Sequence, residues 1–290
     1  MFDESRNPPV HGLVDWVIRR FRMFAWVTCC LVLYMIAASA VGFALTPGLW
    51  VGTNLSSLGA DSGPAGRMLW LAMGISAGAF VTGGALIIVV PIYNLFLPTR
   101  LKPFKGGFYT IASLPWFIHN ALFYLVRFTV LPFITLTPFG LWFLSAMGMK
   151  IGKRAFVNTE CISDACLISL GKDVVVGGSV TLFAHYGGAG HLNLSPVEIG
   201  DRATIGIKAT IMGDVIVGAD AVIMPHTVLL PGTRVGPGET WAGVPGRPVS
   251  KEELEQHRQI ARGQSGVQLQ GQCAPEASDQ TSQTAQTAQG

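Results

Sequence analysis

A period of six residues runs through the second half of the chain and restricts its fold more than any other feature. The register from residue 151 is IGKRAF, VNTECI and SDACLI, then, after one extra Ser169, LGKDVV, VGGSVT and LFAHYG. It resumes at Ile199 with IGDRAT and IGIKAT, and aliphatic residues keep the first position of each unit up to Val235. Six matches neither the alternation of a half-buried strand nor the turn of an amphipathic helix, so each unit predicts one short strand and one turn.

Three such units predict one triangular coil of a parallel solenoid, because the first-position side chains of successive coils then stack inside. Small residues at the fifth position (Ala203, Ala209 and Ala221) fit the corners, and the frequent second-position glycines are expected to permit the turns. Parallel strands of a doubly wound sheet are the alternative, but no helical pattern separates the units. We therefore predict a β-solenoid over residues 150–249.

The first half of the chain is apolar and almost uncharged, which is typical of a membrane domain. No residue is charged between Arg22 and Asp61, or between Arg67 and Arg100. Each gap exceeds the roughly 20 residues that a helix needs to cross a bilayer. The sequence therefore predicts two spans, over about 23–49 and 68–91.

The rest of the membrane domain, which we expect over residues 23–149, leaves its topology open. Two further apolar segments, 106–126 and 128–149, are barely long enough to span, contain prolines and are separated only by Arg127. They are expected either to cross the bilayer or to lie at its surface. Residues 1–22 alternate apolar and basic groups and predict an interfacial amphipathic segment.

Charge and cysteine content narrow the class of protein. Basic residues precede the first predicted span and follow the second, so both flanks and the solenoid are expected on the cytoplasmic side. A net charge of +3 gives no reason to expect a nucleic-acid partner. The five cysteines form no even framework and are expected to be reduced thiols.

The repeat resembles the left-handed β-helix of hexapeptide-repeat acyltransferases over about residues 151–249. The closing WAGVPGRPV is similar to the segment with which many members end their coils and contact coenzyme A. The run ISDACLISLGKDV…LFAHYGGAGHLNLSPVEIGDRATIG, preceded by apolar helices, resembles the membrane-linked β-helix region of peptide synthetases such as polylysine synthetase. The sequence holds one such unit and no adenylation or carrier domain, which leaves the activated donor open.

The resemblance implies a membrane-anchored acyltransferase of a bacterial inner membrane. It would move an acyl group, expected to be acetyl, from a coenzyme A thioester to an amine or hydroxyl of a membrane-associated acceptor. Members of the family typically form homotrimers. Two alternatives stay open: an amide-forming enzyme that uses an aminoacyl thioester on a carrier protein, and a non-catalytic assembly protein.

An interruption of the repeat between Leu182 and Ile199 predicts a loop, AHYGGAGHLNLSP, that leaves the coil. The resemblance implies that a loop histidine removes the acceptor's proton, and His185 matches by its position directly after the coil strand. A histidine suits this step because its imidazole is largely neutral at pH 7. His191 is the second candidate, with support of the loop's conformation as its alternative role.

A carboxylate is expected to orient the imidazole, and Glu198 or Asp173 are the candidates, either being otherwise a solvated turn residue. His119 lies beside Asn120 in an apolar stretch, where it could help to hold the acyl acceptor near the bilayer. A hydrogen bond between helices is the simpler interpretation.

The donor site is predicted from small and basic residues near the later coils. Backbone N–H groups of Gly206 and Ile207 are candidates for stabilising the thioester oxyanion. Ala209, Ala242 and Gly243 leave room for a pantetheine arm, and Lys208, Arg202 and Arg247 are candidates for binding phosphates. The histidines and cysteines show none of the close spacings of zinc sites, so no metal is expected.

The chain after the solenoid begins with SKEELEQHRQIAR, which predicts a short helix over 250–262. Ser250 and Glu253 have the spacing of a capping box. Residues 263–290 are rich in Gln, Ser, Thr, Ala and Gly and predict a disordered, solvated tail.

Overall fold

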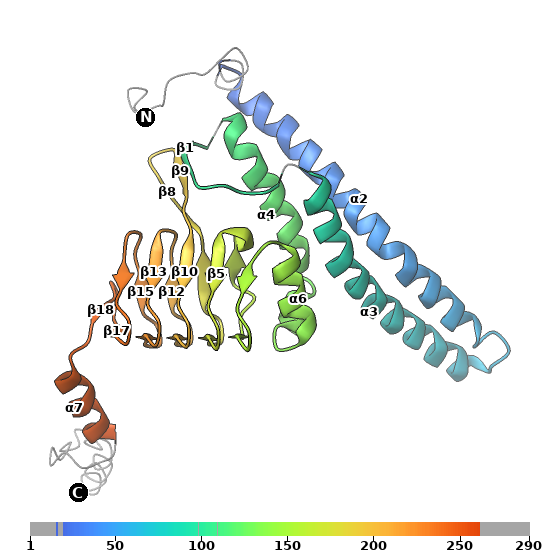
Figure 1. The fold of residues 1–290 in the computed structure, drawn as a ribbon. Coiled ribbons are helices and arrows are strands. Elements are labelled where there is room, and N and C mark those ends of the chain that lie inside the picture. The colour runs from blue at the N-terminus through green and yellow to red at the C-terminus, as the bar shows by residue number, and fades with distance from the viewer. Residues whose placement is uncertain (1–15, 17–19, 98, 109, 262–290) are drawn as a thin grey trace, which may run out of the picture. The chain divides into compact units, whose positions relative to one another are not determined.

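A computed structural model describes residues 16, 20–97, 99–108 and 110–261 of the chain (Figure 1). It divides after Val249 into two units, each of which is described by itself. The predicted tail over 263–290 and almost all of the predicted interfacial segment over 1–22 lie outside the described residues.

Two long helices, α2 (Arg22–Ser57) and α3 (Pro64–Phe96), form an antiparallel hairpin in the first unit (Figure 1). Both are long and apolar enough to cross a membrane, and among the described residues they are the only two such helices. Each extends beyond the C-terminal end of the predicted span, because the uncharged sequence continues there up to Asp61 and Arg100. Most of their large apolar side chains are exposed, among them Phe80 and Phe96.

Glycines bring the two helices of the hairpin into backbone contact. Gly48 and Gly52 on α2 face Gly74 and Gly78 on α3, each pair with the four-residue spacing of close-packed membrane helices. A Cβ at Gly48 would lie 2.5 Å from the carbonyl oxygen of Gly78, and a Cβ at Gly74 would lie 2.5 Å from that of Gly52. Only glycine therefore permits this approach.

The segment over 106–149 forms short elements rather than spans. They are β1 (Phe104–Gly107), the 3-10 turn η2 (Ile111–Ser113), α4 (Leu114–Arg127), α5 (Leu131–Ile134) and α6 (Pro138–Ala146). None of these helices reaches the length that crosses a bilayer. Arg127, the lone charge of the segment, ends α4 with its guanidinium 5.2 Å from the ring of Tyr124, 5.1 Å from that of Phe128 and 5.6 Å from that of Phe183.

Short parallel strands after α6 stack into a solenoid of three sheets (Figure 1). The first sheet holds β2 (Lys150–Ile151), β5 (Ile168–Leu170), β10 (Val197–Ile199), β13 (Val215–Val217) and β16 (Arg234–Val235). The second holds β3 (Phe156–Val157), β6 (Val175–Val176), β11 (Thr204–Ile205), β14 (Val222–Ile223) and β17 (Thr240–Ala242), with β18 (Arg247–Pro248) antiparallel at its edge. The third holds β4 (Ile162–Ser163), β7 (Thr181–Phe183), β12 (Thr210–Ile211) and β15 (Val228–Leu229).

The core consists of the columns that the repeat predicts. Ile199 pairs with Leu170 on one side and with Val217 on the other, and all three side chains are buried. The predicted corner residues Ala203, Ala209 and Ala221 are fully buried as well. The predicted parallel β-solenoid is therefore confirmed.

The glycines have a different role from the one predicted. The turns are made by fourth-position residues with positive φ, such as Arg202 (59°), Lys208 (56°) and His226 (61°). A Cβ at the second-position Gly206 would lie 2.5 Å from the backbone nitrogen of Pro225 in the next coil. The expectation that these glycines permit the turns is wrong, since they permit the coils to stack closely.

One register assignment also needs correction. Ile162, and not Ser163, pairs with Leu182 in the core column, while Ser163 pairs with Phe183. The extra residue of the repeat is taken up at the corner between Asp164, which has φ 58°, and the 3-10 turn η3 (Ala165–Leu167).

The interruption of the repeat leaves the coil, as predicted, and forms a β-hairpin. Its strands are β8 (His185–Gly188) and β9 (His191–Leu194), and β1 extends them into a three-stranded antiparallel sheet. A hydrogen bond of 2.9 Å from Ser195 N to Ala184 O closes the neck of the loop. The chain that leads from the α2–α3 hairpin thus pairs directly with the loop that carries His185.

The second unit contains α7 (Lys251–Ala261), which confirms the predicted C-terminal helix. Glu253 N donates to Ser250 Oγ at 3.1 Å, and Ser250 N donates to a Glu253 carboxylate oxygen at 3.4 Å. These two bonds form the predicted capping box.

Candidate active site

His185 lies at the first residue of the inserted loop and is held by a buried carboxylate. Its Nδ1 lies 2.5 Å from Asp164 Oδ2, and the Asp164 side chain is fully buried while the His185 side chain is 21% exposed. The imidazole stacks on Phe183 with ring centroids 5.4 Å apart, and it packs edge-to-face with Trp116 at a centroid distance of 5.2 Å. Asp164 thus occupies one ring nitrogen, and Nε2 is the other.

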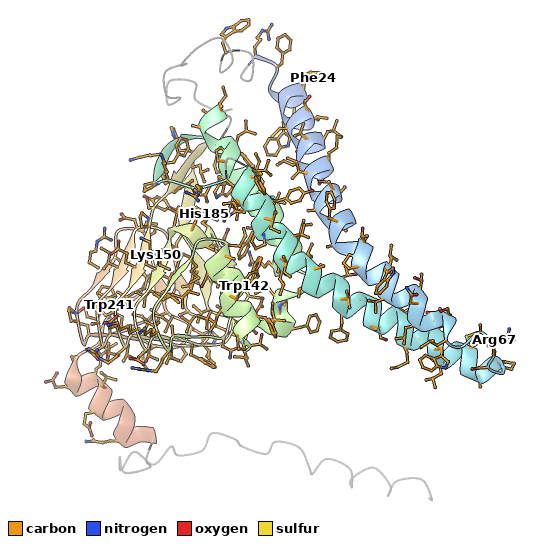
Figure 2. The ribbon with its side chains drawn as sticks, turned by 45° about the vertical axis from the view of Figure 1, so that its right-hand side comes forward. Phe24, Arg67, Trp142, Lys150, His185 and Trp241 are labelled. Atoms are coloured by element: carbon orange, nitrogen blue, oxygen red, sulfur yellow. The ribbon has the colours of Figure 1, made fainter. Side chains whose placement is uncertain are left out.

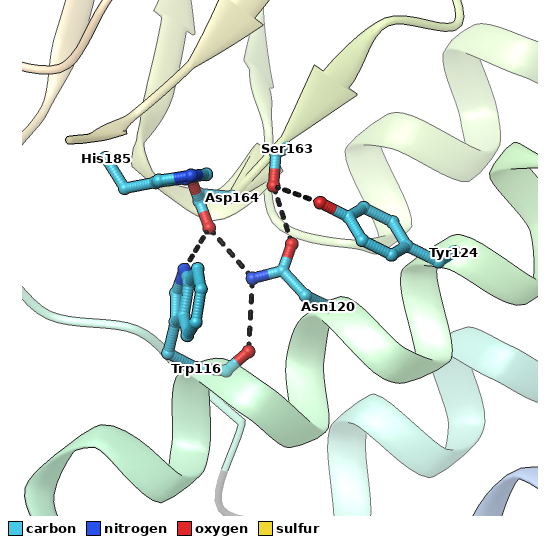
Figure 3. A network of polar contacts seen from close by, with 6 residues as sticks. All are labelled: Trp116, Asn120, Tyr124, Ser163, Asp164 and His185. Atoms are coloured by element: carbon cyan, nitrogen blue, oxygen red, sulfur yellow. Dashed lines mark hydrogen bonds and ion pairs between the residues drawn. The ribbon is translucent and has the colours of Figure 1, made fainter. Parts of the chain in front are cut away.

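Helix α4 supplies two further hydrogen bonds to the same carboxylate (Figure 3). Trp116 Nε1 donates to Asp164 Oδ1 at 2.8 Å, and Asn120 Nδ2 donates to the same oxygen at 3.0 Å. Three donors therefore surround one buried carboxylate, two of them on Oδ1 and one on Oδ2. A buried carboxylate requires such partners, because its charge is otherwise very costly to remove from water.

Asn120 is itself fixed by its neighbours. Its Oδ1 accepts from Ser163 Oγ at 2.6 Å, and its Nδ2 also reaches the carbonyl of Trp116 at 3.1 Å. Tyr124 OH lies 3.4 Å from Ser163 Oγ. Trp116, Asn120 and Tyr124 are spaced by four residues and therefore share one face of α4. That face lies on the solenoid, and Figure 2 shows His185 between this helix and the strands.

Another side of α4 packs on the α2–α3 hairpin through His119. Its Nδ1 lies 3.1 Å from Asn94 Oδ1 of α3, so the predicted hydrogen bond between helices is present. Burial lowers the pKa of His119 to about 4, although the nearby Asp164 charge opposes that change. His119 is therefore neutral at pH 7.

The chemistry of the site favours a base over a covalent nucleophile. Cys166 lies two residues from Asp164, but burial raises the pKa of its thiol to about 11. At neutral pH it is a protonated thiol, whereas the reactive form of cysteine is the thiolate. Among the described residues, no three His, Cys, Asp or Glu side chains are grouped so that they could hold a metal ion.

Neither carboxylate predicted to orient His185 does so. Asp173 accepts a two-pronged hydrogen bond from Arg154, at 2.6 and 2.7 Å, on the solenoid surface. The bond to Arg154 holds the pKa of Asp173 below its usual value. Glu198 is exposed on β10, in the first sheet, whereas His185 continues from the third. The carboxylate that orients the imidazole is Asp164.

His191 lies apart from the pair. It is opposite Gly188 near the tip of the loop hairpin, whereas His185 is opposite Leu194 at its base. Three residues of strand separate the two positions, roughly 10 Å at about 3.3 Å per residue.

The predicted oxyanion donors are not both available. The Gly206 N–H donates to the carbonyl of Ile223 at 2.7 Å, inside the ladder between coils. The Ile207 side chain is exposed at the following turn.

The predicted donor-binding residues mostly share one corner of the solenoid. Lys208 and Ala209 follow β11, Ala242 ends β17, and Gly243 follows it; β17 occupies the same sheet two coils later. Arg247 lies opposite Ala242 in the β17–β18 pair. Arg202 belongs to another corner, where it binds Asp220 at 2.7 Å, and that bond raises its pKa.

The residues that sequence reasoning missed are Asp164, Trp116 and Asn120. The disturbed register at Ser163 marks the corner that holds Asp164, and this signal was present in the sequence. Trp116 and Asn120 are far from His185 along the chain, and no local pattern connects them to it.

Comparison with known proteins agrees with this architecture. Residues 196–231 match the family model described as bacterial transferase hexapeptide (six repeats). The hexapeptide repeat is confirmed. The comparison with curated proteins found no match.

Solved structures with a similar fold include a hexapeptide-repeat-containing acetyltransferase from Vibrio cholerae, at 24% identity and a TM-score of 0.33. The match covers 36% of this chain and 63% of that one. A maltose O-acetyltransferase from Clostridium difficile 630 matches at 20% identity and a TM-score of 0.43, over 53% and 95% of the two chains. A serine acetyltransferase from Neisseria gonorrhoeae matches at 17% identity and a TM-score of 0.35, over 75% and 69%. At these identities the likeness concerns the fold.

Proposed function

We propose that this chain is a membrane-anchored acyltransferase in which His185 is the general base. The observation that carries the proposal is the 2.5 Å contact between His185 Nδ1 and the buried Asp164 carboxylate. A carboxylate accepts a hydrogen bond from Nδ1–H and thereby leaves Nε2 unprotonated, which is the form that removes a proton from an attacking amine or hydroxyl.

The proposed reaction needs no covalent enzyme intermediate. The acceptor loses its proton to Nε2 as its lone pair attacks the thioester carbonyl. The tetrahedral intermediate then collapses, the C–S bond breaks, and the proton passes from Nε2 to the departing thiolate. His185 ends the cycle neutral, and the protonated thiol of Cys166 supports this direct transfer.

The donor is proposed to be an acyl thioester of coenzyme A, and the acyl group is expected to be acetyl. Lys208 and Ala209 follow β11, and Ala242 and Gly243 lie at the end of β17, two coils later in the same sheet, which supports a single binding strip along that corner. A carrier protein would present the same pantetheine arm. An aminoacyl thioester on a carrier protein is therefore tested as an alternative donor to acetyl-coenzyme A.

Membrane anchoring is proposed from α2 and α3, whose large apolar side chains are mostly exposed and whose crossing has the glycine spacing of membrane helices. The cytoplasmic orientation, the left-handed coil and the homotrimer stay predictions from the sequence and its resemblance.

The test uses the full chain in proteoliposomes prepared from a bacterial lipid extract. Radiolabelled acetyl-coenzyme A and, separately, an aminoacylated carrier protein are supplied, and both free thiol and labelled lipid or amine are measured. His185→Ala is expected to lower transfer about 100-fold or more while acetyl-coenzyme A still binds. His226→Asn, which keeps a residue tolerant of positive φ at its turn, is the matched control. A folded His185→Ala variant with undiminished transfer contradicts the proposal.

A further inference from the structure

The face of α4 that covers the solenoid does more than attach it to the hairpin. Its polar side chains do not contact His185 through hydrogen bonds, and instead they converge on the carboxylate behind it. Among the described residues, the hydrogen bonds to Asp164 Oδ1 come from this helix, while Oδ2 contacts His185. The base and its orienting group therefore belong to the solenoid, and the groups that orient Asp164 belong to the segment between the membrane hairpin and the solenoid.

We propose that Trp116 and Asn120 are positioning residues that set the tautomer of His185 by acting through Asp164. This inference rests on the proposed function. Two N–H donors on Oδ1 stabilise the ionised carboxylate and fix its plane, so that Oδ2 faces Nδ1 and the proton stays on that nitrogen. Without them the carboxylate is free to rotate away from Nδ1, the imidazole proton is no longer held on that nitrogen, and the population with an unprotonated Nε2 in the correct place decreases.

The geometry supports a specific role for each residue. Trp116 is held by a hydrogen bond and by ring contacts. Its Nε1 donates to Asp164, and its ring centroid lies 5.2 Å from that of His185 and 4.9 Å from that of Phe117. Asn120 is buried, and its other amide atom is held by Ser163 Oγ, so it presents its N–H to Asp164 in one orientation. A residue that only filled space between α4 and β4 would not need both donors aimed at one oxygen.

The consequence is that the α4 segment is part of the acyl-transfer site. We expect that a solenoid without α4 folds its coils, yet has an unsupported Asp164. The hairpin α2–α3 in turn holds α4 through His119 and Asn94, which connects the membrane helices to the base through one short path of contacts.

The experiment compares Trp116→Phe and Asn120→Leu with the wild type, in the full chain in proteoliposomes. Trp116→Phe keeps an aromatic ring beside His185 and removes the indole N–H together with the larger bicyclic ring, a loss of size that its control shares. Trp142→Phe on α6, a half-exposed indole, is its matched control, and Asn54→Leu on α2 is the control for Asn120→Leu. Two quantities are measured: kcat and KM for acetyl-coenzyme A, and the ¹⁵N spectrum of ring-labelled histidine, in which His185→Ala assigns the signals.

Each variant is expected to lower kcat about tenfold with KM changed less than twofold, because a hydrogen bond to a charged group in a buried site is removed without touching the donor site. The ¹⁵N signals of His185 are expected to move from the Nδ1–H tautomer towards a mixture, while those of the two controls do not move. A loss of kcat with unchanged His185 signals overturns the inference, and so does a Trp116→Phe variant that matches the wild type in both measurements.

The two proposals fail separately. If the wild type transfers no acyl group but Trp116→Phe shifts the His185 tautomer, the positioning inference stands and the proposed function is wrong. If the wild type is active and both variants leave the tautomer unchanged, the proposed function stands and the positioning inference is wrong.

Discussion

Replacing Asp164 with asparagine tests the site most sharply, because the substitution keeps the size of the side chain and removes only its charge and one acceptor. In the native arrangement Oδ1 accepts from Trp116 and Asn120, and Oδ2 accepts from His185. An amide has one oxygen and one NH₂ group, so Asn at this position satisfies only one of the two sides. The side with two donors is expected to take the oxygen, and the NH₂ group then points at His185 Nδ1.

The size of the effect follows from the count of donors. An NH₂ group at Nδ1 forces that nitrogen to accept, so the proton moves to Nε2 and the base is lost. Turning the amide around restores the tautomer but leaves the two N–H groups of α4 buried without an acceptor. Each costs about 1–3 kcal/mol, so the active form lies about 2–6 kcal/mol above the inactive one. We expect kcat to decrease about 10³-fold, which corresponds to roughly 4 kcal/mol.

The assay is label transfer from acetyl-coenzyme A in proteoliposomes, with Asp173→Asn as the matched control. Asp173 is a partly exposed carboxylate paired with Arg154 on the solenoid surface, and its variant is expected to lose less than twofold in activity. The reasoning also predicts a partial rescue, in which Trp116→Phe and Asn120→Leu, added to Asp164→Asn, remove both competing donors and let the amide oxygen turn to His185. A triple variant slower than Asp164→Asn alone, or an Asp164→Asn variant as active as Asp173→Asn, refutes it.

Three further predictions concern stability. Gly206→Ala is expected to lower the unfolding free energy by about 1–3 kcal/mol, because the added Cβ meets the backbone of the next coil at 2.5 Å, whereas Gly188→Ala, which adds a methyl group to open space, is the control in thermal denaturation. Gly74→Ala is expected to lower the melting temperature in detergent, since its Cβ would lie 2.5 Å from a carbonyl of α2, and Gly84→Ala on the same helix is expected not to. The pKa of His119 is lowered to about 4, so its neutral form contributes its full stabilisation above pH 6.5. The unfolding free energy is expected to decrease by up to about 3 kcal/mol as the pH falls from 6.5 towards 4, and to lose no more from this group below that. His119→Gln should flatten this dependence in denaturation measured across that range.

The solenoid could be predicted from the sequence because its signal is local and repeated. Each hexapeptide places one aliphatic residue inward, and the register of coil on coil follows from the count of six, as the stacking of Leu170, Ile199 and Val217 confirms. The roles of the glycines could not be read in the same way. A second-position glycine is required by the backbone of the next coil, which is close in space but not in sequence. Residues such as Arg202 and Lys208 adopt a positive φ at the turns although their side chains do not favour it.

The contact between His185 and its carboxylate partner could have been predicted from the irregularities of the repeat. The repeat is irregular twice, once after Ile162 and once after Leu182, and both residues lie in the third strand of their coils. Equivalent strands of successive coils are neighbours, about 4.8 Å apart, so the two irregular corners must lie side by side. Asp164 follows the first and His185 follows the second, and their contact is therefore a consequence of the period. The same argument cannot place Trp116 or Asn120, because α4 lies before the repeat begins and its position on the third sheet depends on packing and hydrogen bonds that the period does not encode.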